Sequence, residues 1–175
     1  MMPTPSGMPA DALIELTLEQ VRQMLHAGET RAGLLCCLIT AAEALAGPGA
    51  VSSILVIDNQ GLLRNGASPN LPADYLDAID RLKPDARVGT CAAAAATGTV
   101  VVTPDFRADE KWAELRHLPL ALGFVGAWSM PIKSDGGKVI GTFGTYFRDH
   151  RLPSTRERQG VERLAEAAAQ VLAAR

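Results

Sequence analysis

The 175-residue sequence lacks any run of basic residues, and its formal net charge is only −2 at pH 7. A chain with so little net charge has no long-range attraction to nucleic acid or to an anionic membrane surface. It also lacks an uninterrupted apolar run of about 18 residues, the length that a bilayer-spanning helix needs. Residues 1–9 lack the basic and apolar regions of a signal peptide and are expected to form a disordered tail. These absences predict a cytoplasmic protein that binds neither nucleic acid nor membrane.

Cysteine and histidine are scarce as well, with three of each. Cys36 and Cys37 are neighbours on a predicted helix and point about 100° apart, so they are interpreted as packing residues rather than a redox pair. An odd cysteine count without a leader sequence is typical of reduced thiols and not of a disulfide framework. No histidine lies at metal-ligand spacing from another ligand, so no metal is expected. The sequence does not name a cofactor.

Apolar residues make up 47% of the chain and charged residues 21%, which suits the core of a single domain, expected over residues 10–175. The periodicity predicts helices at 10–27 and 31–46, a hairpin of strands 52–58 and 62–67, short helices at 73–82 and 90–97, a strand at 100–103, one or two short helices within 107–122, a second hairpin of strands 124–132 and 139–147, and a helix at 154–174. Helices and hairpins segregated in this way predict an α+β fold around an antiparallel sheet.

The strand predicted at 139–147 carries glycine on both of its faces. Gly141 shares one face with Phe143 and Phe147, while Gly144 and Tyr146 share the other. Because glycine lets another element approach a strand closely, one face is expected to receive packed helices and the other a ligand.

Several motifs resemble, in order, those of a GAF domain, in particular the bacterial kind found beside PAS modules and histidine kinases. They are SILVIDNQG from residue 53, NGASPNLPADYLDAID from 65, VGTC and its alanines from 88, TPDFRADEKWAELR from 103, AWSMPI from 127 and GKVIGTFGTYFRDHRLPS from 137. Two positions depart from the motifs. Ala127 stands where this subgroup usually has cysteine before Trp-Ser, and Ala92 stands where it usually has glycine after the first cysteine.

The resemblance implies a GAF-like, profilin-related fold. Its central antiparallel sheet would have five to six strands, with the terminal helices on one face and short helices, loops and a ligand pocket on the other. It also implies a regulatory module that senses a small molecule in signal transduction, with an output protein in trans because no kinase, cyclase or helix-turn-helix motif is visible. Since this fold hosts many ligands, the resemblance does not identify the one bound here. A ligand-free dimerisation scaffold remains an alternative.

The residues expected to line the pocket are Cys91, Trp112, Phe124, Trp128, Tyr146 and His117. Trp and Tyr offer apolar surface with a polar group at one end, and Trp128, followed by Ser129 on a strand, is the tryptophan better placed to bind an acceptor. His117 follows Arg116, and the two could together bind an anion. Each candidate also has a structural interpretation: core or lid anchors for the tryptophans, and a solvated pair for Arg116 and His117.

Cys91 is the one candidate for covalent chemistry. It lies near the start of a predicted helix, where backbone N–H groups and the helix dipole favour a thiolate. Its Gly-x-Cys setting resembles that of GAF-type free methionine-(R)-sulfoxide reductases, so a thiol-based redox sensor or such a reductase is the alternative function. Those enzymes use further cysteines, and residues 105–123 contain none. We therefore predict no catalytic residue and no enzyme activity, with Cys91 packed between helix and sheet as the simplest interpretation.

The apolar stripes of the helices at 10–27 and 154–174 exceed what one face of a small sheet needs for its cover. On the first helix the stripe contains Ile14, Leu18, Val21 and Leu25. The pattern predicts a homodimer through these two helices and leaves open whether it is parallel or antiparallel.

Overall fold

The computed structural model describes residues 8–174, and the tail predicted at 1–9 lies largely outside them. Five antiparallel strands form one sheet in the order β2-β1-β5-β4-β3. The strands are β1 (Val51–Ile57), β2 (Leu63–Ala67), β3 (Val101–Thr103), β4 (Gly126–Lys133) and β5 (Val139–Phe147). The α+β class and the antiparallel sheet are confirmed.

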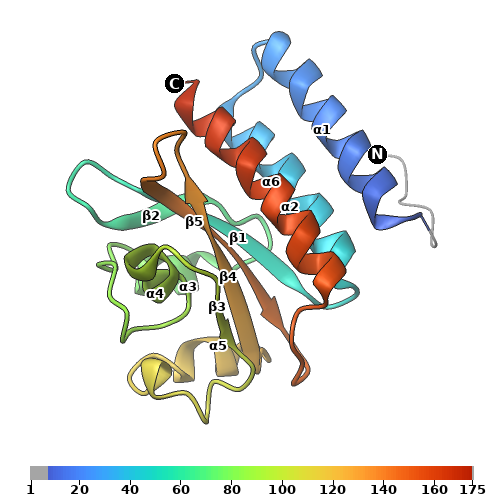
Figure 1. The fold of residues 1–175 in the computed structure, drawn as a ribbon. Coiled ribbons are helices and arrows are strands. Elements are labelled where there is room, and N and C mark those ends of the chain that lie inside the picture. The colour runs from blue at the N-terminus through green and yellow to red at the C-terminus, as the bar shows by residue number, and fades with distance from the viewer. Residues whose placement is uncertain (1–7, 175) are drawn as a thin grey trace.

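Three long helices cover one face of this sheet (Figure 1). They are α1 (Ala10–His26), α2 (Arg31–Ala46) and α6 (Thr155–Ala173). Helices α2 and α6 pack on the sheet, and α1 packs on both of them as an outer layer. Because α2 lies between α1 and the sheet, apolar residues occupy most of its circumference, and Thr40 is exposed. In this helix-side core, Leu38 of α2 and Leu164 of α6 join Phe143 and Phe147 of β5.

The helix starts follow from local capping chemistry. Thr30 Oγ1 accepts a hydrogen bond from the Gly33 backbone N–H at 3.1 Å and begins α2. Ser154 and Glu157 form a reciprocal capping box that begins α6. Side-chain caps of this kind satisfy N–H groups that the first helical turn leaves unpaired.

Short elements cover the opposite face of the sheet. They are α3 (Ala73–Ile79), α4 (Cys91–Thr97), the 3₁₀ turn η1 (Glu110–Trp112) and α5 (His117–Ala121). Helix α3 ends three residues before the predicted position. Arg81 takes a positive φ of 65°, and its N–H donates to the Leu63 carbonyl while the Leu63 N–H donates to Leu82. The chain therefore leaves the helix to extend the sheet beside β2.

The segment at residues 105–123, here called the lid, carries η1 and α5 across the short-helix face (Figure 1). A second core lies beneath it and includes Tyr75, Phe106, Trp112, Phe124 and Tyr146. No helix within residues 8–174 combines the length and hydropathy that a membrane crossing requires.

Candidate ligand pocket

A cavity of about 30 Å³ lies between the short-helix face of the sheet, α3, α4 and the lid. Its aromatic walls are Tyr75, Trp112 and Tyr146. Its aliphatic lining is Leu55, Leu63, Ile79, Leu82 and Leu115, and its small residues are Gly89, Ala92, Ala127 and Gly144. Thr90 and Cys91 line it at the start of α4, and the paired residues Trp128 of β4 and Thr145 of β5 complete the wall.

The strand pairing explains why there is space at this point in the sheet. Ala127 of β4 lies opposite Tyr146 of β5, and Ser129 lies opposite Gly144, so small side chains are adjacent on one face. A Cβ at Gly144 would lie 2.8 Å from the Cys91 Sγ. Glycine is therefore required there for α4 to pack on the strand.

Two tyrosines close one side of the cavity. The hydroxyls of Tyr75 and Tyr146 are 2.8 Å apart and their rings meet edge to face, with centroids 5.8 Å apart. Burial raises the pKa of both phenols, so both are neutral near pH 7. The Phe124 ring packs on that of Tyr146, with the ring centroids 5.2 Å apart. Phe124 belongs to the core behind the cavity and does not line the cavity.

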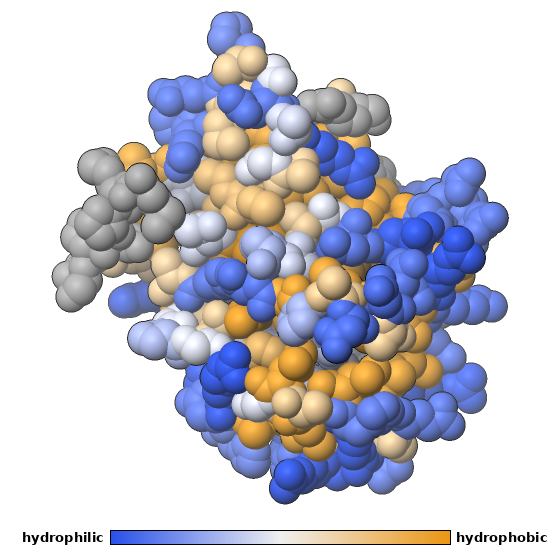
Figure 2. Space-filling view, turned by 180° about the vertical axis from the view of Figure 1, so that it is seen from behind, coloured by the Kyte–Doolittle hydropathy of each residue, from blue (hydrophilic) through white to orange (hydrophobic). Residues whose placement is uncertain are grey.

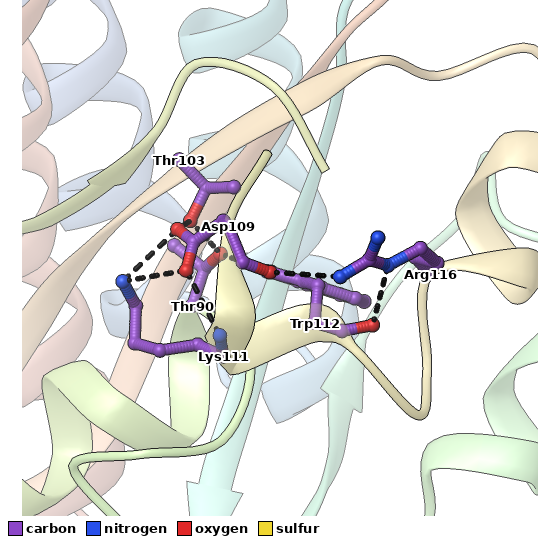
Figure 3. A network of polar contacts seen from close by, with 6 residues as sticks. All are labelled: Thr90, Thr103, Asp109, Lys111, Trp112 and Arg116. Atoms are coloured by element: carbon purple, nitrogen blue, oxygen red, sulfur yellow. Dashed lines mark hydrogen bonds and ion pairs between the residues drawn. The ribbon is translucent and has the colours of Figure 1, made fainter. Parts of the chain in front are cut away.

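Trp112 is held to the start of α4 by a chain of hydrogen bonds (Figure 3). Its indole Nε1–H donates to Thr90 Oγ1 at 2.8 Å, Thr90 and Thr103 are linked at 2.9 Å, and Thr103 Oγ1 donates to Asp109 Oδ2 at 2.9 Å. An ionised carboxylate only accepts, so the Thr103 proton points to Asp109 and Thr90 must donate to Thr103. The chain thus runs in one direction, from Trp112 to Asp109, and joins α4, β3 and the lid.

Asp109 is ionised at the end of this chain. Burial alone would raise the pKa of its carboxyl, but hydrogen bonds from Lys111 and Thr103 outweigh burial and hold the pKa below its ordinary value. Lys111 Nζ lies 3.0 Å and 2.9 Å from the two carboxylate oxygens. The charge of Asp109 is therefore neutralised locally and is separated from the cavity by Thr103 and Thr90.

Arg116 and His117 do not reach the cavity. Arg116 donates to backbone carbonyls of the lid, at 2.9 Å to Arg107. It also donates at 3.4 Å to the carbonyls of both Asp109 and Trp112 (Figure 3). The His117 side chain is exposed at the start of α5 and is not part of the pocket wall. The structure thus gives Arg116 a role in shaping the lid, and it does not support a joint anion site in the pocket.

Trp128 of β4 is among the residues that surround the cavity, but its side chain points to the helix side of the sheet. The residue lies opposite Thr145 in the sheet and packs in the helix-side core with Phe143 and Phe147. Its indole Nε1 is buried there without a hydrogen-bond partner. Tyr146 faces the pocket, so its cross-strand partner Ala127 faces the pocket as well. Because side chains alternate along a strand, the next residue, Trp128, faces the other side of the sheet.

Cys91 lies in the pocket wall, but its environment does not favour a thiolate. Burial raises the pKa of the thiol, and the hydroxyls of Ser129 and Thr142 beside it only partly oppose that effect. The helix-start argument that predicted an activated thiol is therefore outweighed by burial in an apolar site. Cys36 and Cys37 pack against the helix-side core, on the other side of the sheet.

Tyr75, Thr90 and Leu115 belong to the site but were not selected from the sequence. Tyr75 could have been found from the helix predicted at 73–82, where it is the single aromatic residue. The position of Thr90 became informative only through its contacts with Trp112 and Thr103, which the sequence does not place beside it. Within residues 8–174, no group of three or more potential ligands is arranged to hold a metal ion.

Comparison with known proteins identifies the family. A family model described as a GAF domain matches residues 8–173. The methyl sulfide methyltransferase-associated sensor of Methanosarcina acetivorans is 32% identical over 149 residues, which are 85% of this chain but only 15% of that protein.

Solved structures share the fold at low sequence identity. The GAF domain of a phosphoenolpyruvate-protein phosphotransferase from Coxiella burnetii has a TM-score of 0.74 at 17% identity, covering 95% of this chain and 96% of its own. The free methionine-R-sulfoxide reductase of Neisseria meningitidis, solved with its substrate, has a TM-score of 0.68 at 20% identity, covering 97% and 93%. With the family model matching nearly its whole length, this chain belongs to the GAF domain family.

Proposed function

We propose that this GAF domain is a sensory module that binds a small molecule in the cavity beneath the lid and passes the binding event to the long helices. The observation that supports this most directly is the apolar cavity, bounded by the sheet, two short helices and a lid that the hydrogen-bond chain from Trp112 to Asp109 helps to hold in place. The relative from M. acetivorans is a sensor, which agrees with this function.

The strand β5 offers a short route from the cavity to the helices. Tyr146 faces the cavity, and the next residue, Phe147, faces the helix side beneath the Arg151 guanidinium, 3.9 Å from its ring centre. Arg151 also donates to Glu157 of α6 at 2.7 Å and to the Ala46 carbonyl at the end of α2. Movement of β5 at the cavity would therefore shift the start of α6 against α2, as a change between two populated arrangements.

The reductase alternative has less support. Fold similarity at 20% identity does not carry activity, and the pKa of the Cys91 thiol is raised by burial. The chain's other two cysteines lie on the opposite side of the sheet. A redox function of Cys91 would need a resolving thiol from another molecule.

The dimer remains part of the proposal, with a changed basis. The dimer was predicted from the apolar stripes of α1 and α6, and within this chain those stripes pack against each other and against α2. The outer face of α1 retains one large exposed apolar residue, Leu16, which is 52% exposed. A monomer in light scattering at micromolar concentration would refute a dimer through α1 and α6.

Location in the cytoplasm is also part of the proposal. All three cysteines are unpaired, with Cys36 and Cys37 adjacent on α2 and Cys91 on α4. Free thiols of this kind are typical of a reducing compartment.

Native mass spectrometry of the protein purified from its own cells tests the sensing function. We expect a population with an added mass that is lost on denaturation. In the Leu115→Trp variant, which places a bulky side chain at the cavity wall, that population should disappear. If the native mass of the unaltered protein equals that of the bare chain, the cavity is not a ligand site and the scaffold alternative is favoured.

A further inference from the structure

We propose that the pocket selects an uncharged, apolar or aromatic molecule and excludes anions and cations of the same size. This inference rests on the proposed sensing function and adds the chemical class of the ligand. It starts from the composition of the wall, which contains no Asp, Glu, Lys, Arg or His among the residues that the structure describes.

The wall gives a charged ligand no ionised side chain to pair with. Leu55 and Leu63 are the aliphatic residues of its sheet side, and Ile79 and Leu82 come from α3 and the turn that follows it. A ligand carboxylate or ammonium placed among these side chains would lose its hydration without gaining an opposite charge. We therefore expect a charged analogue to bind at least roughly 100-fold more weakly than its neutral counterpart.

Four of the polar side-chain groups at the wall already have partners. The Tyr75 and Tyr146 hydroxyls bond to each other, and the Trp112 indole N–H and the Thr90 hydroxyl belong to the chain that ends at Asp109. A strongly polar ligand would have to break one of these buried bonds. The tyrosine pair can add one hydrogen bond to a ligand, because a phenol oxygen that donates still has acceptor capacity.

The size of the cavity indicates how such a molecule enters. About 30 Å³ holds little more than one water molecule, whereas a benzene-sized guest occupies a cavity of about 150 Å³. A ring therefore requires part of the wall to move. Leu115 is the wall residue best placed for this, because it lies in the lid and is only half-buried.

The surface around the lid has the same character as the cavity. Leu115, Leu118, Leu120 and Leu122 are partly exposed where they pack on the second core. Figure 2 shows apolar surface gathered in the lower part of the molecule, the part that holds α5 in Figure 1. An apolar molecule would thus meet a compatible surface before it reaches the cavity.

Toluene, benzoate and benzylammonium test the inference because they share one ring and differ in charge. Their binding to the full chain is followed by calorimetric titration and by the shift in melting temperature. We expect saturable binding of toluene with a raised melting temperature, and at least roughly 100-fold weaker binding of the two ions.

Two matched lid variants locate the binding. Leu115→Trp fills the cavity from the half-buried lid, and Leu118→Trp adds the same side chain to a lid residue outside the cavity wall. Toluene binding should be lost in the first variant and kept in the second. Far-UV circular dichroism of both variants checks that the fold is retained.

Each other outcome overturns the inference. If benzoate or benzylammonium bound as tightly as toluene or more tightly, the proposed ligand class would be refuted. If Leu115→Trp also blocked the binding of that ion, the cavity would still be the ligand site of a sensing domain. Toluene binding that survives Leu115→Trp would refute the site. If none of the three probes binds, the ligand class is wrong, and native mass spectrometry of the cell-derived protein separately decides the sensing function.

Discussion

Thr103 is the central link between the lid and the body of the domain, and Thr103→Val isolates its hydroxyl. The side chain is fully buried, and its hydroxyl accepts from Thr90 and donates to the Asp109 carboxylate at 2.9 Å. Valine keeps the shape but removes both bonds. A hydrogen bond to a charged group contributes about 1.5–3 kcal/mol, and the stranded Thr90 hydroxyl costs about 1 kcal/mol more, so we expect a loss of about 2–4 kcal/mol in the free energy of unfolding.

Thr142→Val is the matched control for this change. Thr142 is also fully buried in the same sheet, but its hydroxyl has no nitrogen or oxygen partner and faces the weakly polar Cys91 thiol. Its replacement should change stability by less than about 1 kcal/mol in either direction. Urea unfolding with linear extrapolation measures both variants, and equal m-values make them comparable.

Hydrogen exchange separates a local effect on the lid from a global loss. In Thr103→Val, amides of the lid should exchange faster relative to those of α2 than they do in the unaltered protein. The reasoning would be refuted if Thr103→Val cost no more than Thr142→Val, or if lid exchange were unchanged.

Four further outcomes follow from the contacts. Asp109→Asn should destabilise the protein at pH 7. The folded-state pKa of the Asp109 carboxyl is depressed below 3.8, so the difference in free energy of unfolding between the two proteins should be complete above pH 3.8 and should vanish as pH falls through the folded pKa. Urea titrations at a series of pH values measure this difference, and a difference that does not change with pH would contradict the prediction. Arg151→Ala should lower the free energy of unfolding, measured with urea, by about 3 kcal/mol, because Glu157 is only 5% exposed and loses its cationic partner. A loss below about 1 kcal/mol would argue against the proposed route from β5 through Arg151 to α6. Gly144→Ala should cost about 1–3 kcal/mol through its clash with the Cys91 sulfur, and most of that cost should be absent in a Cys91→Ala background; additive costs would rule out the clash. In the folded protein the Cys91 thiol, with its raised pKa, should react slowly with a disulfide reagent at pH 7, whereas rapid reaction would revive the redox alternative.

Sequence reasoning worked best where the causes of structure are local. The caps at Thr30 and Ser154 act within three residues, and both predicted helix starts are confirmed. The strand at 139–147 was predicted with its observed bounds and with Tyr146 and Phe143 on opposite faces, because alternation is also a local property.

The parts of the site that escaped prediction depend on distant partners. Tyr75 matters because its hydroxyl meets that of Tyr146, 71 residues later. The Trp128 side chain lies on the helix side of the sheet, which follows from the pairing of β4 with β5 and not from the residues next to it in the sequence. The packing interpretation of Cys91 is favoured for a similar reason, because burial by other segments raises the pKa of its thiol and opposes the effect of its own helix.

The two tryptophans provide the most direct test of the central claim, that a small apolar molecule binds on the short-helix face of the sheet. In a ¹H–¹⁵N NMR titration with toluene, the two indole N–H signals report on the two faces independently. We expect a saturable shift of the Trp112 signal and a smaller change at Trp128, because Trp128 borders the cavity as part of β4 but its side chain lies in the helix-side core. An unmoved Trp112 signal, or a larger shift at Trp128, would contradict it.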